Sequence, residues 1–332
     1  METHDPYPIK AWIAMRHDPF NCMPDPRRQE KYFDNCDLLV SIDAHYSEFG
    51  WYADIILPEA TYLERDNENV VQKGPKPRLA RRVRALEPEN DVRPSWRIFK
   101  ELAEQLGMND FFPFATIEEY WKWQLEPTGF KLEDFDKKGF IPLTDEVVMY
   151  DPAKLDGQFN TPSGKIEIIS KKLTDAGLPS LLEYESPLRP PKGMFRLVYG
   201  RTAVHTHGHT INNPLLNELI PENSLWINEK SAAKLGIAEG DLVEVASESE
   251  GYTGTIRAHV VDYIHPEAVY MLHGFGREVS YQSRAYRAGV SDQKLMENKL
   301  DDWDRAGGGI NLCEAFVVVR PSVRNSARRV EL

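Results

Sequence analysis

Residues 195–219 read FRLVYGRTAVHTHGHTINNPLLNEL and contain the densest cluster of hydrogen-bonding side chains in this chain. The apolar run 195–199 predicts a short β-strand that ends at Gly200. Arg201 follows at once, and the planar fork of N–H groups on an arginine matches two phosphate oxygens. The loop adds further donors at Thr202, His205, Thr206, His207, His209 and Thr210. This strand end therefore predicts a site for a large phosphorylated ligand.

The three histidines of this loop, His205, His207 and His209, alternate along the chain. Alternate residues of an extended segment point to one side, so their spacing also suits a zinc ion. No cysteine or carboxylate stands nearby to complete a tetrahedral set of ligands. A third interpretation is that the histidines only satisfy hydrogen bonds within the loop. Residue types alone leave these interpretations open.

Short apolar runs continue after this loop and are separated by turns that contain glycine. Many short strands with a single helix are typical of a closed barrel. The runs predict further strands at residues 225–228, 241–246, 254–261 and 268–272, and a helix at residues 230–235 that ends at Gly236.

The amino-terminal segment instead alternates between apolar runs and helical stretches. Strands are predicted at residues 9–15, 38–42 and 53–57, with a helix at residues 27–33. Such crossovers indicate a parallel sheet that binds ligands at the carboxyl ends of its strands. A helix that opens at Pro94 and Ser95 and stops at Gly107 closes this segment. The sequence thus predicts a partial α/β domain at residues 1–108, a mixed connecting region at 109–191 and a barrel at 192–330. The connecting region should contain a turn at 161–164 and a strand at 165–170.

Asp43 follows the predicted strand 38–42, at the sheet edge where ligands bind. Its two carboxylate oxygens match the adjacent N–H groups of a guanine or the hydroxyls of a ribose. A helix or loop cap is an equally compatible role for this residue type. Asn213, which stands before Pro214, is expected to cap a helix rather than to touch a ligand.

Four stretches carry a family resemblance by their order and spacing: GRTAVHTHGHTINNPLLNEL (200–219), LWINEKSAAKLGIAEGDLVEV (225–245), HPEAVYMLHGFG (265–276) and GGGINL (307–312). The chain resembles the molybdopterin-dinucleotide oxidoreductases of the dimethyl sulfoxide reductase family, most of all the catalytic subunits of thiosulfate and polysulfide reductases. The resemblance runs from Pro8 to about Arg320. It implies the C-terminal part of such a subunit, with a fold of class α/β plus β in which a partial parallel α/β sheet domain precedes a double-psi β-barrel.

The resemblance implies molybdenum bis(molybdopterin guanine dinucleotide) as the cofactor. Asp43 and Ser47 match the residues that hold a guanosine. Arg201 matches a ligand of a phosphate or pterin carbonyl, and Asn228 either reads a guanine edge or fixes a turn. Phe275 sits beside His273 in a glycine-rich strand end, where its ring would stack on the cofactor. The remaining cofactor contacts implied are Thr202, His205, Thr206, His207, His273 and Asn311. The resemblance assigns no catalytic residue and no protein ligand of the metal to this chain.

Charge and composition limit the partners. A net charge of −12 disfavours nucleic acid, and the one basic run, 76–84, lacks an aromatic platform. No apolar stretch approaches the ~20 residues that cross a bilayer, so no direct membrane insertion is expected. The three cysteines are widely spaced, which gives no pattern for zinc or an iron–sulfur cluster. By resemblance, the partners are an amino-terminal half with an iron–sulfur cluster, an iron–sulfur electron-transfer subunit and a membrane-anchor subunit, in the periplasm.

The resemblance implies that the complete enzyme transfers an oxygen or sulfur atom, coupled to two electrons. Thiosulfate, polysulfide, tetrathionate or arsenate is the expected class of substrate. The chain alone is expected to be inactive, because the family's metal ligand and iron–sulfur domain lie in the amino-terminal region. Two other classes stay open, namely a non-catalytic module that binds molybdopterin or a partner, and a barrel that serves protein interaction alone.

Overall fold

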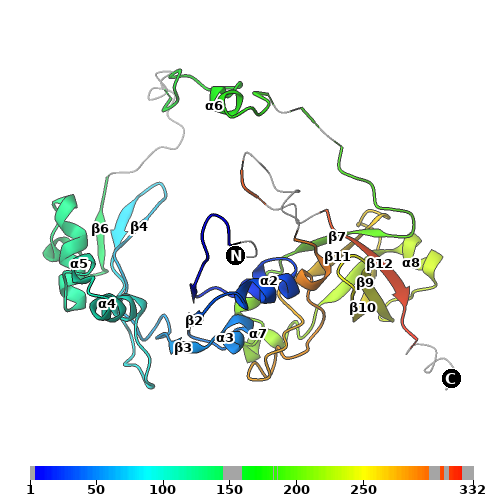
Figure 1. The fold of residues 1–332 in the computed structure, drawn as a ribbon, viewed down its shortest axis with the longest axis horizontal. Coiled ribbons are helices and arrows are strands. Elements are labelled where there is room, and N and C mark those ends of the chain that lie inside the picture. Colours follow the sequence, from blue (N-terminus) through cyan, green and yellow to red (C-terminus); the bar gives the residue numbers. More distant parts are fainter. Residues whose placement is uncertain are drawn as a thin grey trace. The chain divides into compact units, whose positions relative to one another are not determined.

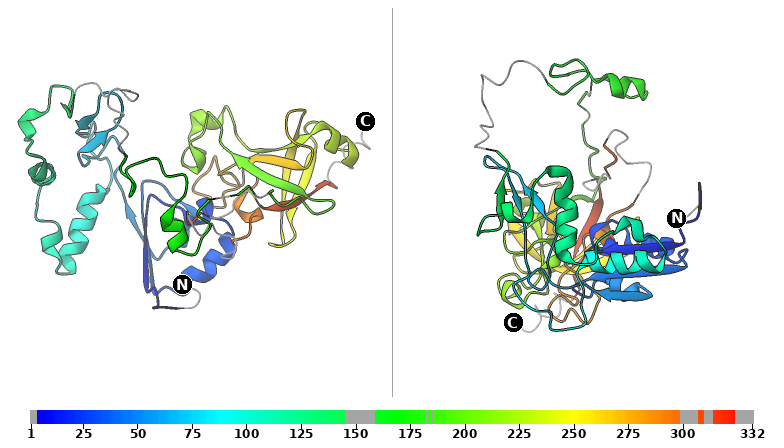
Figure 2. Two further views of the ribbon diagram at one scale, coloured as in Figure 1. Left: turned by 90° about the horizontal axis from the view of Figure 1, so that it is seen from above. Right: turned by 90° about the vertical axis from the view of Figure 1, so that its left-hand side faces the viewer.

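The computed structural model describes residues 4–144, 159–181, 183–184, 186–298, 307–309 and 314–323. The chain divides into two compact units, whose elements can be followed in Figures 1 and 2. Unit 1 combines residues 1–56 with residues 182–332, and unit 2 comprises residues 57–181. Within the described ranges, no helix has the length and apolar character needed to cross a bilayer.

Unit 1 begins with a three-stranded sheet in the order β1-β2-β3. β1 and β2 run parallel, in a register that pairs Ala11 with Leu38 and Met15 with Ile42. The parallel pairing expected from the apolar runs is confirmed for these two strands. The elements of this part are β1 (Ala11–Met15), α1 (Pro19–Cys22), α2 (Pro26–Phe33), β2 (Leu38–Asp43), α3 (Glu48–Tyr52) and β3 (Ile55–Pro58).

Aromatic rings fill the space between this sheet and its helices. The ring of Phe33 on α2 meets Phe20 at 5.4 Å and Phe49 at 5.1 Å between centroids, both in edge-on geometry. Ala14 and Leu39 supply the strand side of the same buried cluster. Edge-on packing of buried rings is favourable, so this cluster fixes where the loops after β1 and β2 emerge.

The second part of unit 1 is a closed barrel in which six strands, among the described residues, follow the order β10-β8-β11-β7-β12-β9. The pairs β10–β8 and β11–β7 are parallel, and the other pairs are antiparallel. The expected closed barrel is confirmed, whereas its double-psi connectivity stays a prediction. The elements are β7 (Phe195–Gly200), η4 (His207–His209), α7 (Pro214–Asn217), β8 (Ser224–Asn228), α8 (Glu229–Leu235), β9 (Leu242–Ser247), β10 (Tyr252–Val261), β11 (Ala268–Leu272), η5 (Gln293–Leu295) and β12 (Phe316–Pro321).

Side chains that alternate along the strands fill the barrel. Val243 and Val245 of β9 and Ile256 and Ala258 of β10 all point inward and are buried. Leu295 of η5 belongs to the same core, so this short turn of helix is anchored to the barrel.

Unit 2 combines an antiparallel sheet of order β4-β5-β6 with helices. Trp96 of α4 lies 6.2 Å from Phe114 and 6.1 Å from Tyr120 between ring centroids. A capping box of Thr116 and Glu119 starts α5. The elements are β4 (Val70–Gln72), β5 (Arg78–Ala80), α4 (Ser95–Gln105), η1 (Asn109–Phe111), α5 (Ile117–Leu125), η2 (Glu126–Thr128), η3 (Leu132–Asp134), β6 (Phe140–Pro142) and α6 (Lys171–Asp175).

The compact units and the expected domains divide the chain at different residues, and one expected strand is not formed. The compact units divide the chain near residues 56 and 181, because the aromatic contacts of α4 lie with residues 114–120 of unit 2 and not with the sheet of unit 1. The three-domain division at 108 and 191 stays a prediction. The strand expected at residues 165–170 is wrong: this segment is irregular, and Ile166 and Ile168 are exposed. Its apolar residues pair with no strand in the described part of the chain.

Candidate functional site

Two loops of unit 1 emerge side by side because β7 and β11 are parallel neighbours. Their register pairs Gly200 with Leu272, so Arg201 and His273 both leave the sheet at the same edge. His273 N donates to Gly200 O at 3.0 Å, and Tyr270 Oη donates to Arg201 O at 3.2 Å. The structure therefore brings together two of the predicted site residues, Arg201 and His273, which stand 72 positions apart in the sequence (273 − 201).

A cluster of rings and cations forms at this edge. The His207 ring lies 5.5 Å from the His273 ring, and the Tyr199 ring lies 5.7 Å from it on another side. Burial, followed by the charges of His273, Arg201 and His209, lowers the pKa of His207 below its usual value. These side chains thus lie close enough to interact electrostatically, and the Arg201 guanidinium supplies the fixed positive charge among them. Arg201 itself is exposed, and within the described residues no hydrogen bond or ion pair of its guanidinium is found.

Glycines allow the two loops to touch. Gly274 has a φ of +99°, and a Cβ on it would lie 2.8 Å from the backbone nitrogen of Gly208. A Cβ on Gly208 would in turn lie 2.0 Å from Arg277 Nη2. Side chains at these positions would separate the loop after β7 from the loop after β11. The glycines of the strand end 273–276 therefore allow a close approach between two protein loops, whereas their approach to a cofactor ring stays a prediction.

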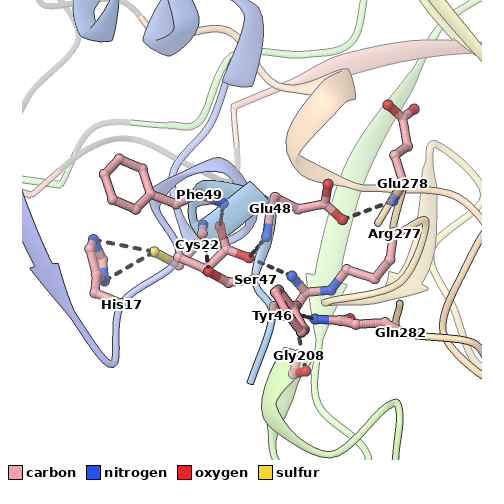
Figure 3. Close-up of polar contacts among 12 residues, drawn as sticks. His17, Cys22, Tyr46, Ser47, Glu48, Phe49, Gly208, Arg277, Glu278 and Gln282 are labelled. Atoms are coloured by element: carbon pink, nitrogen blue, oxygen red, sulfur yellow. Dashed lines mark hydrogen bonds and ion pairs between the residues drawn. The ribbon is translucent and has the colours of Figure 1, made fainter. Parts of the chain in front are cut away.

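Arg277 links these barrel loops to the sheet of unit 1 (Figure 3). Its Nη1 donates to Asp18 Oδ2 at 2.5 Å, and its Nη2 donates to Gly208 O at 3.2 Å. Asp18 also accepts from the backbone nitrogens of Glu48 at 3.1 Å and Phe49 at 3.2 Å, at the start of α3. Sequence reasoning missed Arg277. The local signal in the sequence was an arginine that directly follows the glycine-rich strand end 273–276.

Ser47 lies beside this link and is buried. Its Oγ accepts from Gly50 N at 2.9 Å, so it is the N-cap of α3. Across the same interface, Glu278 N donates to Glu48 Oε1 at 2.8 Å, and the Tyr46 and Tyr281 rings stack at 4.9 Å. The loop at residues 277–282 is therefore joined by hydrogen bonds and ring stacking to the loop after β2. Figure 3 shows the hydrogen bonds of Glu278 and Gln282.

Cys22 lies next to the same network, with its Sγ 3.5 Å from His17 Nδ1. Although Cys22 is exposed, the protein atoms around its thiol and then the neighbouring Asp18 carboxylate raise the pKa of the thiol to about 11. Cys22 is therefore protonated at neutral pH and is not an activated nucleophile. Within the described residues, no three side chains of His, Cys, Asp or Glu converge as metal ligands, which leaves the zinc interpretation of His205, His207 and His209 without support.

Several predicted site residues have internal partners. The buried His205 ring lies with Nε2 3.0 Å from Ile220 O. Phe275 is 1% exposed in an apolar cluster with Ile211 and Leu272. Asn228 caps α8 and donates to Ile264 O at 2.9 Å, which matches the turn-fixing alternative. Direct contact of these side chains with a cofactor stays a prediction.

The other predicted residues lie closer to the surface. Asp43 is half-buried and its Oδ1 accepts from His45 N at 3.2 Å, while Thr202 Oγ1 accepts from Val204 N at 3.3 Å. Thr206 is exposed. Asn213 caps α7 through Leu215 N and Leu216 N, so its expected capping role is confirmed. Asn311 lies outside the described residues.

A cavity of about 570 Å³ lies in unit 2, lined by α4 and by segments near Arg65 and Arg84. Its charged side chains pair with one another, as Arg97 does with Glu101 at 2.7 Å. The exposed guanidinium of Arg201 and the histidines of unit 1 are the better candidate site. Their donors and positive charges fit an anionic, phosphate-bearing group such as a dinucleotide.

Comparisons with known proteins identify the domains of the chain. The Molybdopterin oxidoreductase family model matches residues 1–105, and the Molydopterin dinucleotide binding domain model matches residues 195–307. The second match contains Arg201, His207 and His273.

Curated relatives are much longer than this chain. The thiosulfate reductase molybdopterin-containing subunit PhsA of Salmonella typhimurium is 32% identical over 319 residues, which cover 89% of this chain and 41% of the relative. The acetylene hydratase of Syntrophotalea acetylenica is 24% identical and is matched over 92% of this chain and 42% of its own length. Dimethyl sulfoxide reductase DmsA of Escherichia coli is 28% identical over 63% of this chain and 29% of its own length.

A solved structure has the same fold. Acetylene hydratase from Pelobacter acetylenicus superimposes with a TM-score of 0.79 at 21% identity, over 97% of this chain and 45% of that one. The chain therefore carries a molybdopterin oxidoreductase domain and a molybdopterin dinucleotide-binding domain, and these matches imply molybdenum bis(molybdopterin guanine dinucleotide) as the cofactor.

Proposed function

We propose that this chain holds part of the dinucleotide cofactor in the catalytic subunit of a molybdopterin oxidoreductase. The observation that carries the proposal is that the Arg201 guanidinium and the rings of His207 and His273 gather at the carboxyl ends of two parallel strands. A pyrophosphate needs donors and positive charge, and this edge of the barrel supplies both. When bound, the molybdenum cofactor supplies the two-electron atom-transfer chemistry.

In this proposal the residues of unit 1 divide into two roles. Arg201 binds phosphate oxygens, with Thr202 and Thr206 as further donors in the same loop. Asp43, at the carboxyl end of β2, accepts hydrogen bonds from a guanine edge. The link from Arg277 through Asp18 to α3 holds the loops that carry these residues in register.

We infer that the complete enzyme reduces a sulfur compound, such as thiosulfate or polysulfide. The 32% identity to a protein named thiosulfate reductase supports this class. Tetrathionate and arsenate stay within the proposed range. We propose, from the resemblance, that the complete enzyme is periplasmic. Its proposed partners are an iron–sulfur electron-transfer subunit and a membrane-anchor subunit.

The experiment measures cofactor retained by the protein itself. The protein is purified from a host that makes the molybdenum cofactor, and guanosine monophosphate released by acid hydrolysis is quantified together with molybdenum. We expect both in the wild type and about tenfold less in Arg201→Ala. The matched control is Arg257→Ala, since Arg257 is exposed, with a pair to Glu222 at 3.3 Å and a weak hydrogen bond to Gly240 O at 3.4 Å.

Wild-type protein free of guanosine monophosphate and molybdenum would contradict the proposed function. If Arg201→Ala retained as much guanosine monophosphate and molybdenum as the wild type, Arg201 would not be a ligand of the cofactor. Sulfide released from thiosulfate, with a reduced dye as the electron donor, tests the class of substrate. This assay uses the complete subunit, which includes the amino-terminal half. Sulfide release supports a sulfur compound as the substrate, and turnover of arsenate without sulfur compounds contradicts a sulfur compound as the substrate.

A further inference from the structure

A buried carboxylate lies directly behind the histidine cluster. Asp292 Oδ2 is 2.8 Å from His273 Nδ1, and the two side chains are 1% and 10% exposed. The same carboxylate accepts from Gln293 Nε2 at 2.9 Å and from Gly274 N at 3.4 Å. Among the described residues, no lysine or arginine forms an ion pair with it. In the described part of the chain, the His273 ring is the ionisable group at hydrogen-bond distance from this buried carboxylate, whose charge also acts on His207.

The position of Asp292 is fixed by its neighbours and not by the ring. It is the residue before η5, and Leu295 and Met296 at the end of η5 lie in the barrel core. On the other side, Asp25 N donates to Gln293 O at 3.1 Å, which ties η5 to the start of α2. Because the carboxylate is held from both sides, the ring of His273 adapts to it.

This geometry decides which ring nitrogen carries the proton. An ionised carboxylate only accepts hydrogen bonds, so the nitrogen that faces it, Nδ1, must be the donor. A carboxylate behind an imidazole fixes both the tautomer and the orientation of the ring. In the described part of the chain, no hydrogen bond of His273 Nε2 is found. Nε2 is therefore the nitrogen that remains for a ligand.

We propose that Asp292 is a positioning residue that aims His273 Nε2 at a phosphate of the bound dinucleotide, with Nε2 protonated when it donates. The inference rests on the proposed function, and it deepens the site by adding a carboxylate that the sequence did not mark. His207 lies close enough to both Arg201 and His273 to feel their charges. A phosphate placed there would meet the fork of Arg201 and the Nε2–H of His273 together.

The first test reads the tautomer in the protein without any ligand. Long-range nitrogen–proton NMR of protein labelled with ¹⁵N-histidine distinguishes a ring with the proton on Nδ1 from one with the proton on Nε2. We expect the Nδ1–H form for His273 in the wild type and a mixture in Asp292→Asn, because an amide can donate as well as accept. A neutral His273 ring with its proton on Nε2 in the wild type overturns the proposal, whatever the variants do.

The second test measures binding by calorimetry with three named probes: guanosine diphosphate, pyrophosphate and guanosine. We expect Asp292→Asn to lower the affinity for guanosine diphosphate and for pyrophosphate about tenfold. The affinity for guanosine should not change. His273→Gln should lower the affinity for the same two probes. The double variant should lose little more affinity than either single variant, because both substitutions remove the same contact. The matched control is Asp262→Asn, at an exposed position after β10, which should bind as the wild type does.

The two tests separate this inference from the proposed function. If the wild type binds none of the probes, the proposed cofactor site fails, while the NMR reading still decides whether Asp292 orients His273. If the wild type binds guanosine diphosphate and Asp292→Asn binds it equally well, the positioning role fails and the proposed function stands. Thermal melting of each variant shows whether it is folded, so a loss of binding with an unchanged melting temperature is the supporting result.

Discussion

Arg277 Nη1 donates to Asp18 Oδ2 at 2.5 Å, although the two residues stand 259 positions apart in the sequence. Their side chains are 6% and 13% exposed, so this is a buried ion pair that joins the barrel to the sheet within unit 1. Asp18 also caps α3 through two backbone nitrogens. Removing one partner of such a pair leaves the other charge buried and uncompensated.

Arg277→Ala should therefore lower the free energy of unfolding of unit 1 by about 3–5 kcal/mol. Urea denaturation measures the loss, and hydrogen exchange of the amides of Glu48 and Phe49 should become faster. Arg257→Ala is the matched control, because its pair with Glu222 is about half exposed and should contribute about 0–1 kcal/mol. Equal losses in the two variants would show that the Asp18 link does not stabilise unit 1.

The two strand-end loops require glycine where they touch. Gly274→Ala places a Cβ 2.8 Å from a backbone nitrogen at a φ of +99°, so we expect a loss of about 2–4 kcal/mol. Gly236→Ala is the matched control: its φ is +69°, but a Cβ there would meet nothing within 4 Å, and its cost should be about 1 kcal/mol. Similar melting temperatures for both variants would contradict the close approach of Gly274 to Gly208.

Ser47 has two proposed roles that mutation can separate. As the N-cap of α3, Ser47→Ala should cost about 1 kcal/mol of stability, and Ser47→Thr should keep most of it. A role confined to guanosine binding predicts loss of bound guanosine monophosphate without loss of stability. Chemical denaturation and nucleotide analysis of the same two variants decide between the roles.

The stability of unit 1 should depend on the ionisation of Glu250, in the turn between β9 and β10. Burial, followed by the carboxylates of Asp25 and Glu297, raises the pKa of Glu250 from 4.5 to about 7. Between these two values, the folded protein holds a proton that the unfolded chain has released. This contribution to stability is therefore lost as the pH rises from about 4.5 to about 7.

Glu250→Gln should remove that part of the pH dependence, because an amide carries no charge to release. The pH-dependent change in stability should be small, because the Glu250 side chain is only half-buried and solvent screens its charge. Melting temperatures across this pH range measure the effect. Glu248→Gln, at an exposed position of the same turn, should leave the wild-type pH profile unchanged.

Elements bounded by glycine or proline could be predicted from the sequence. The strand that ends at Gly200, the helix that ends at Gly236 and the parallel pairing of β1 with β2 are present in the structure. The three strands of unit 2 are each only three residues long, too short for a periodic pattern. The apolar run 316–319 forms most of β12, a strand that was not among those predicted from the sequence.

The site was predictable where its residues follow strand ends, and not where partners are distant in sequence. Arg201 and His273 stand directly after apolar runs, so the sequence marked both. Asp18 and Asp292 are placed by contacts that span 259 and 19 positions, and no local spacing encodes them. Phe275 shows the converse: the glycines around it suggested a ring open to a ligand, whereas the fold buries that ring in an apolar cluster.

The most direct test of the central claim is an experimental structure of the protein with molybdopterin guanine dinucleotide bound. We predict that the Arg201 guanidinium lies about 3 Å from a phosphate oxygen and that a carboxylate oxygen of Asp43 lies at a similar distance from a guanine N–H. A cofactor bound elsewhere, with Arg201 and Asp43 both facing solvent, would contradict the account.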